Sequence, residues 1–227
     1  MNIADLWAEI EAEQTWRQDE VRFFQNQLGN FASDDDKNKY RKALILLLYA
    51  HFEGFCKFAF THYVKAINLE NLTCGQANYA IAAASLSEIF QALCNLDKKS
   101  SEFKNILPED KKLHIFARDK EFLENVNKFE SKALAIPDEL VDTESNLKPV
   151  VLRKNLFKLG FPHDKFEHLE GQINKLLQFR NNIAHGANIS GIGKDDYEKL
   201  RDDVNLIISE VKQEIMSALQ NSAYLRT

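Results

Sequence analysis

The sequence of 227 residues contains few residues that interrupt helices, with only 8 glycines and 4 prolines. Proline removes a backbone donor and glycine costs conformational entropy, so their scarcity leaves long stretches free to run as helices. No segment has the alternating pattern of a strand, and none repeats at a fixed period. The expected fold class is therefore all-α, a helical bundle.

Cysteine is also scarce. Cys56, Cys74 and Cys94 are widely spaced and odd in number, and they form neither a CxxC pair nor a zinc-ligand pattern with histidine. Cys56 lies in an apolar helical segment, where we interpret it as a small buried hydrophobic residue and not as a nucleophile. Free thiols suit a reducing compartment, so we expect a cytoplasmic protein.

Positive charge is not in excess. The 29 Lys and Arg residues face 34 Asp and Glu residues, giving a formal net charge of -5 and a pI near 5.7. This excludes a protein that coats nucleic acid through its overall charge, but not an enzyme with a local basic cleft.

A long apolar run is missing as well. The N-terminus has no basic patch followed by an apolar segment, so we expect no signal peptide. The most apolar stretch, residues 43–50, is interrupted by His51 and Glu53, well short of the ~20 residues of a membrane span. We therefore expect a buried core helix and no membrane association.

Two helices are indicated in the first third of the chain. Residues 3–28 predict an amphipathic helix ended by Gly29 as a left-handed cap. Ser33 is the expected N-cap of a second helix, with aspartates 34–36 in its first turn, where the helix dipole favours negative charge. From Tyr40 this helix is apolar on nearly every face, which is typical of the central helix of a bundle.

The middle of the chain is less regular. Residues 78–96 predict a third helix. Residues 99–150 carry one or two short helices at most and too little apolar density for a core of their own, so we interpret them as an insertion. Residues 1–227 are thus expected to form a single helical domain.

Three more helices are expected after the insertion. A short helix over 150–159 stops at Gly160, and Asp164 caps a helix that Gly186 closes. A last helix runs from about Asp195, and its apolar stripe would pack along a neighbouring helix.

Residues 178–186, with the sequence QFRNNIAHG, end the penultimate helix and concentrate the chemistry. Asn181 and His185 are four apart and share one face. Arg180 lies about 140° around the helix from His185, but its long side chain reaches the same cleft. The outward carbonyls of the last turn favour the protonated form of His185.

These residue types suit the cleavage of RNA, which supplies its own nucleophile, the 2′-hydroxyl group next to the phosphate. Histidine moves protons near neutral pH, and the arginine fork stabilises the negatively charged phosphorane. The scheme requires no metal and no cofactor. A histidine followed by glycine is also an ordinary helix end, so spacing alone leaves a structural role open.

The run Arg180-Asn181-x-x-x-His185, placed before a long final helix, resembles the Arg-x4-6-His motif of the HEPN superfamily. Upstream, residues 46–55 have the sequence LLLYAHFEGF, which is similar to the second-helix signature of a stand-alone, toxin-like microbial HEPN clade. Two separate matches in the expected order are more specific than either one. They cover the helical framework from Tyr40 to Leu219, but not the 99–150 insertion.

The resemblance implies a bundle that dimerises so that two Arg/His motifs face one cleft. It implies a metal-independent endoribonuclease that acts on RNA as a toxin or in antiviral defence, held in check by an inhibitory protein such as an antitoxin. Arg180 and His185 would be catalytic, and Asn181 would orient or polarise. Some HEPN toxins are silenced by nucleotide addition to a tyrosine two positions after the histidine; that position is Ala187 here, which puts this control in doubt.

Glu53 and His51 are supporting candidates. A carboxylate in an apolar helix is costly unless it is paired. Glu53 either holds Arg180 by a charge-assisted hydrogen bond or forms an exposed pair with Lys57; the clade signature includes this glutamate. His51 either lines the cleft, has a structural role or is simply exposed.

The leading hypothesis is a homodimeric HEPN endoribonuclease. The alternative is a catalytically inactive HEPN module that binds RNA or serves as an adaptor. A third hypothesis is a structural helical protein whose final helix docks a partner, and it requires Arg180 and His185 to face solvent in separate directions.

Overall fold

The structure is a computed structural model that describes residues 3–95, 97, 99–103, 110–186 and 190–226. Its helices are α1 (Ile3–Asn26), α2 (Asp34–Leu69), α3 (Tyr79–Ser85), α4 (Ser87–Cys94), α5 (Lys111–Asn125), α6 (Pro149–Lys158), α7 (Glu170–Ala184) and α8 (Lys194–Gln220). Short 3-10 turns lie at Gln27–Asn30, Ser101–Phe103, Val126–Lys128, Asp138–Leu140 and Glu167–Leu169. The described residues contain only isolated β-bridges and no strand, so the all-α prediction is confirmed.

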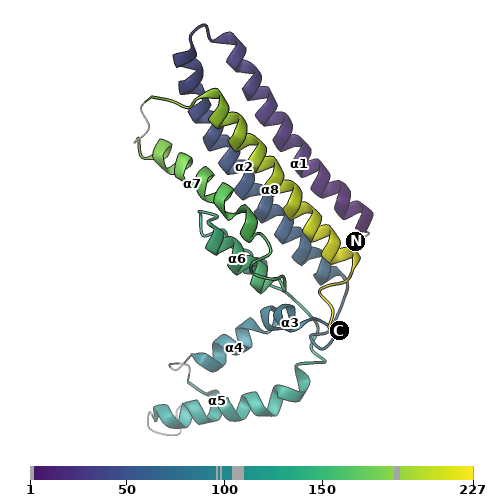
Figure 1. The fold of residues 1–227 in the computed structure, drawn as a ribbon. Coiled ribbons are helices and arrows are strands. Elements are labelled where there is room, and N and C mark those ends of the chain that lie inside the picture. Colours follow the sequence, from purple (N-terminus) through teal and green to yellow (C-terminus); the bar gives the residue numbers. More distant parts are fainter. Residues whose placement is uncertain (1–2, 96, 98, 104–109, 187–189, 227) are drawn as a thin grey trace.

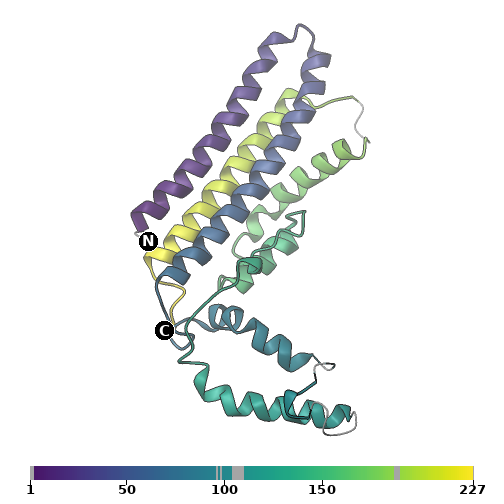
Figure 2. The same cartoon turned by 180° about the vertical axis from the view of Figure 1, so that it is seen from behind.

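Three long helices, α1, α2 and α8, lie side by side, with α6 and α7 along one side of them (Figures 1 and 2). The α2 helix is the centre of this bundle and contacts α1, α7 and α8. It begins as predicted, because the Ser33 side chain accepts a hydrogen bond from the Asp36 N–H group. A cap of this kind stabilises a helix by about 1 kcal/mol.

The apolar stripe of α8 packs within the chain. The main partner of this stripe is α2. All of its members are buried, and they are Tyr197, Leu200, Val204, Ile207, Val211, Ile215 and Leu219. By length and composition α2 could cross a membrane, but 56% of its most apolar window is buried inside the bundle. It is therefore the central core helix that its sequence predicts.

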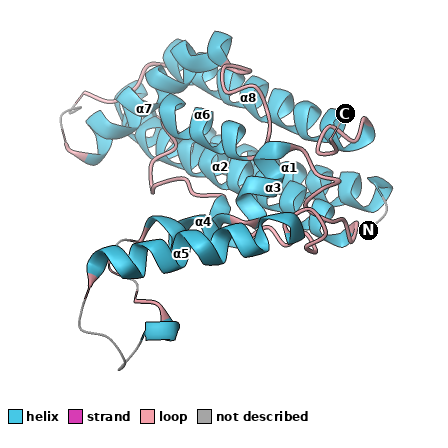
Figure 3. Cartoon of the chain, turned by 90° about the horizontal axis from the view of Figure 1, so that it is seen from below, coloured by secondary structure: helices cyan, strands magenta, loops and turns pink. Residues whose placement is uncertain are grey.

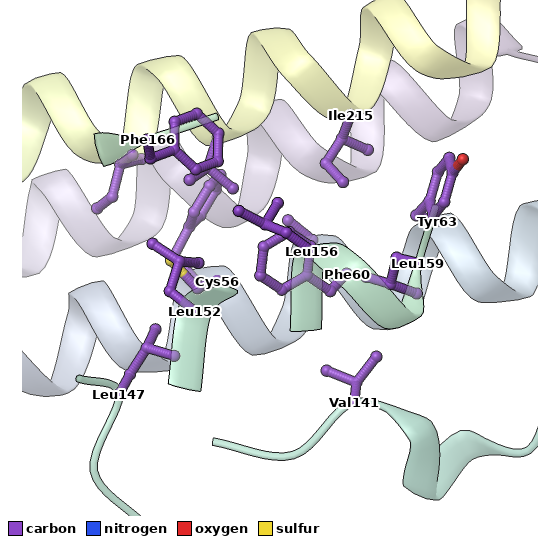
Figure 4. Close-up of a cluster of buried hydrophobic side chains, with 14 of the residues drawn as sticks. Cys56, Phe60, Tyr63, Val141, Leu147, Leu152, Leu156, Leu159, Phe166 and Ile215 are labelled. Carbon is purple, nitrogen blue, oxygen red and sulfur yellow. The ribbon is translucent and has the colours of Figure 1, made fainter. Parts of the chain in front are cut away.

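The core continues between α2 and α6 (Figure 4). Leu152 and Leu156 of α6 lie against the part of α2 that carries Cys56 and Phe60, and Leu147 approaches from the preceding loop. Cys56 is fully buried, and burial raises the pKa of its thiol. It is packed as a small hydrophobic residue, as its sequence context indicates.

Several helix ends lie where the sequence predicts them. Proline stands in the first turn of α6, and Gly160 follows α6 with φ +83°. Gly186 has φ +71°, the left-handed conformation that ends α7.

Three predicted boundaries are wrong. Gly29 lies inside a 3-10 turn and does not take a positive φ. The expected third helix is divided at Leu86 into α3 and α4. Asp164 does not cap α7 with its side chain; its backbone carbonyl accepts from the Glu167 N–H group, and a 3-10 turn intervenes before α7 begins at Glu170.

Helices α3, α4 and α5 form an arm that projects from one end of the bundle, with α4 and α5 side by side (Figures 1 and 3). The α5 helix has 15 residues, and Asp110 caps it by accepting from two N–H groups of its first turn. After α5 the chain returns to the bundle, where Leu134, Ile136, Val141 and Leu147 are buried in the core. The second half of the 99–150 insertion is thus part of the core.

Candidate active site

The last turn of α7 presents Arg180, Asn181 and His185. The His185 N–H group donates to the Asn181 carbonyl (2.9 Å), and Gly186 then turns the chain out of the helix. His185 is exposed, whereas Arg180 and Asn181 are half-buried. The imidazole therefore stands at the rim of this helix end, where a large substrate can reach it.

The Arg180 guanidinium is held from two sides. Its Nη1 donates to Asn181 Oδ1 (2.9 Å), and its central carbon lies 4.7 Å from the centre of the Tyr49 ring. Tyr49 is buried in α2, so it offers a rigid aromatic surface for the cation. No carboxylate in the described part of the chain forms an ion pair with Arg180. The guanidinium is thus oriented but keeps its charge for another anion.

Asn181 connects the two predicted catalytic residues. It accepts a hydrogen bond from Arg180 through its side chain and one from His185 through its backbone carbonyl. This geometry brings all three residues to one helix end, and the orienting role of Asn181 stays a prediction.

Tyr49 ties this helix end to the insertion. Its hydroxyl group donates to Asn146 Oδ1 (3.0 Å) and accepts from the Leu147 N–H group (3.0 Å). Burial raises the pKa of Tyr49, and the nearby Glu53 carboxylate adds to this; the Leu147 N–H group and the Arg180 charge oppose it. The tyrosine therefore stays neutral and serves as a structural hub.

The loop before Asn146 is held in an unusual conformation. Glu144 and Ser145 have φ of 51° and 56°, in the left-handed region that non-glycine residues rarely adopt. Two consecutive residues of this kind cost on the order of 1–2 kcal/mol each. The hydrogen bonds of Asn146 and Leu147 to Tyr49 help to offset this strain.

Glu53 joins the site indirectly. It is half-buried and interacts with the hydroxyl end of Tyr49, while Arg180 lies over the ring. The described side chains contain no Glu53–Arg180 ion pair and no Glu53–Lys57 pair. Neither pairing foreseen from the sequence is present in the described residues; Glu53 and Arg180 each lie beside Tyr49 instead.

His51 lies on another side of α2, two residues from both Tyr49 and Glu53 in sequence and about 200° around the helix from Tyr49. It is buried against α1, with Nδ1 3.2 Å from Arg17 Nη1, Nε2 3.0 Å from Glu20 Oε2 and its ring edge-on to Trp16. Burial, then the Arg17 charge, lower its pKa.

His51 does line a pocket, of about 300 Å³, but this pocket lies between α1, α2 and α8. The structure thus places His51 apart from Arg180 and His185. Ala187, the position where some HEPN toxins carry a tyrosine, lies outside the described residues.

Tyr49 and Asn146 are the site residues that sequence reasoning missed. Tyr49 stands in an apolar run and is four residues before Glu53, a spacing that places both on one helix face. That spacing was the available signal for Tyr49. Asn146 lies in an irregular segment, and no local pattern marks it.

Comparison with known families gives one result. A family model described as RiboL-PSP-HEPN matches residues 13–217, a range that includes both α2 and the last turn of α7. No curated protein and no solved structure matches the chain.

Proposed function

Since the chain belongs to the RiboL-PSP-HEPN family, we propose that it is a metal-independent endoribonuclease whose reactive groups are Arg180 and His185. Membership by itself indicates a nuclease or other RNA-related function. The finer assignment is supported by one observation above all: an oriented guanidinium that pairs with no described carboxylate shares a helix turn with an exposed imidazole.

The reaction proceeds through the 2′-hydroxyl group of the substrate. A base removes its proton, the 2′-oxygen forms a bond to phosphorus, and the bond from phosphorus to the 5′-oxygen breaks as an acid protonates that oxygen. The products are a 2′,3′-cyclic phosphate and a 5′-hydroxyl end. Arg180 stabilises the charge that develops on the non-bridging oxygens, because a guanidinium stays protonated and matches two oxygens at once.

A single imidazole cannot accept one proton and donate another at the same moment. We therefore include a homodimer in the proposal, in which His185 of one copy acts as the base and His185 of a second copy as the acid. Such a dimer does not use the apolar stripe of α8, which is already buried against α2. It has to form through the surface around the end of α7.

Cleavage of a labelled single-stranded RNA in EDTA tests the proposal. The wild-type protein should release products that end in a cyclic phosphate, and His185→Ala should cut slower by about 10²–10⁴-fold. His163→Ala removes an exposed histidine far from this helix turn in sequence and should cut like wild type. A substrate with a 2′-deoxyribose at the cut position should stay intact. Equal rates for wild type and His185→Ala would contradict the assignment, and RNA binding without cleavage would favour an inactive RNA-binding or adaptor module.

We also propose that the activity serves as a cytoplasmic toxin or in antiviral defence, restrained by an inhibitory protein. The support is the resemblance of residues 46–55 and of the Arg180–His185 run to a toxin-like clade. Induced expression of the wild-type chain should arrest bacterial growth, and induction of His185→Ala to the same protein level should not. Equal growth of the two cultures would remove the toxin role and leave the nuclease assay to be judged separately.

A further inference from the structure

The arm carries a buried arginine that the proposed nuclease site does not use. Arg118 lies on α5, and only 6% of its surface is exposed. Its Nε and Nη1 atoms are buried and have no hydrogen-bond partner among the residues that the structure describes. Since a guanidinium stays charged at any physiological pH, this is a desolvated charge and not a neutral polar group.

No described carboxylate neutralises this charge. Glu88 of α4 and Glu121 of α5 are the acidic residues nearby, and both are exposed at the rim of the same cavity without forming an ion pair with Arg118. An unpaired buried charge is strongly destabilising, and an anion bound beside it would compensate this cost.

The Arg118 side chain lines a cavity of about 380 Å³ between α4 and α5. Its walls are mixed: Ile89, Leu93, Phe122 and Phe129 form an apolar side, and much of the rest is polar. The Phe122 and Phe129 rings meet edge to face, with centres 5.3 Å apart, and the Asn125 amide adds a polar group at one side. The volume lies within the range of about 300–1,000 Å³ that is usual for small-molecule sites.

We propose that this cavity binds a small organic monocarboxylate, with its carboxylate on Arg118 and an aromatic or branched apolar body against Phe122 and Phe129. A carboxylate matches the guanidinium in charge and accepts from its N–H groups. The aromatic and aliphatic side of the cavity favours a ligand whose body is apolar.

The acidic rim narrows the choice of ligand. Glu88 and Glu121 repel every anion, and the repulsion grows with the anion's charge, so it is weakest for a single carboxylate and stronger for a phosphate of charge near -2 or for the backbone of a nucleic acid. The cavity is therefore assigned to a metabolite-sized acid and not to RNA. This assignment is independent of the proposed nuclease and gives the insertion a role of its own.

Binding of 3-phenylpropionate to the full-length protein, followed by calorimetry and by the ring signals of Phe122 and Phe129, tests the proposal. We expect saturable binding of the acid and binding weaker by about 30-fold or more for 3-phenylpropanamide, which has the same shape without the charge. This comparison needs no variant. Absence of saturable binding, or equal affinity for acid and amide, would overturn the proposal.

Two variants sharpen the test. Arg118→Met keeps the length of the side chain and removes its charge. Its affinity for 3-phenylpropionate should be lower than that of the wild-type protein by a similar factor. Lys120→Met removes one positive charge from an exposed position of the same helix and should bind like wild type. Unchanged affinity in Arg118→Met, or ring signals that respond to a short single-stranded RNA and not to the acid, would also contradict it.

Discussion

Arg180 at the end of α7 and Arg118 in the arm carry the same group in opposite settings. Arg180 is half-buried, hydrogen-bonded to Asn181 and stacked on Tyr49, so its direction is fixed while its charge stays partly hydrated. Arg118 is almost fully buried, and its Nε and Nη1 atoms have no hydrogen-bond partner in the described part of the chain. The first arrangement suits an anion that arrives and leaves during a reaction. The second arrangement suits an anion that remains bound, because the anion replaces the water that the buried Arg118 guanidinium has lost.

The largest effect should separate the two arginines by activity. Arg180→Ala should lower the initial rate of RNA cleavage by about 10²–10³-fold, and Arg180→Lys should recover only part of it, because an ammonium group cannot match two oxygens. Arg118→Met should cut like wild type in the same assay. An equal loss of rate in both variants would instead make the arm part of the catalytic surface.

Tyr49 should matter for stability through its hydroxyl group and for activity through its ring. Tyr49→Phe leaves the Leu147 N–H group without its acceptor and should cost about 1–3 kcal/mol of unfolding free energy. Because the ring under Arg180 remains, its cleavage rate should stay close to wild type. Tyr49→Leu should lose stability and also slow cleavage. Urea denaturation measures the stability, and initial rates of RNA cleavage measure the activity. A Tyr49→Leu variant that cleaves RNA at the wild-type rate would show that the contact between the Tyr49 ring and Arg180 is dispensable.

Arg118→Met should be neutral or stabilising by about 1 kcal/mol in the ligand-free protein, since it replaces a desolvated charge by an apolar chain of similar length. Urea denaturation measures the free energy of unfolding of Arg118→Met, and Lys120→Met, measured in the same way, is the control. A clear loss of stability in Arg118→Met alone would mean that the guanidinium supports the arm in its own right.

The smallest effect concerns His51, whose pKa burial and the Arg17 charge lower from the ordinary value of 6.5. The folded protein then binds fewer protons than the unfolded chain below that pH. The contribution of neutral His51 to stability is complete above pH 6.5 and is lost as the pH falls through the range below it. His51→Gln should flatten this part of the stability curve, measured by urea denaturation from pH 7.5 to 5. The exposed His163→Gln should leave the slope unchanged.

Much of the framework could be predicted because its signals are local. Ser33 and the apolar run after Tyr40 are enough to place α2, and the stripe from Tyr197 to Leu219 is enough for α8. The break at Leu86 was not predictable, since the Ala-rich sequence favours a continuous helix and the division into α3 and α4 depends on packing.

The candidate site also has a part that the sequence predicts and a part that only the folded chain shows. Arg180, Asn181 and His185 are neighbours in sequence, so helical geometry alone brings them together. The partner of Tyr49 is Asn146, 97 positions away in a segment without regular pattern, and only the folded chain shows the contact. Arg118 stands in a helix rich in charged residues, where nothing distinguishes a buried arginine from its exposed neighbours.

The return of the chain from the arm to the bundle sets where this protein can be trimmed or fused. Residues 134–147 supply core side chains, and Asn146 and Leu147 are hydrogen-bonded to Tyr49, on whose ring the Arg180 guanidinium lies. Excising residues 99–150 would therefore remove support from the proposed catalytic turn of α7. A shorter deletion that spares residues 134–147 would remove the cavity between α4 and α5 alone, so the proposed nuclease and the proposed carboxylate site could be studied in separate versions of one chain.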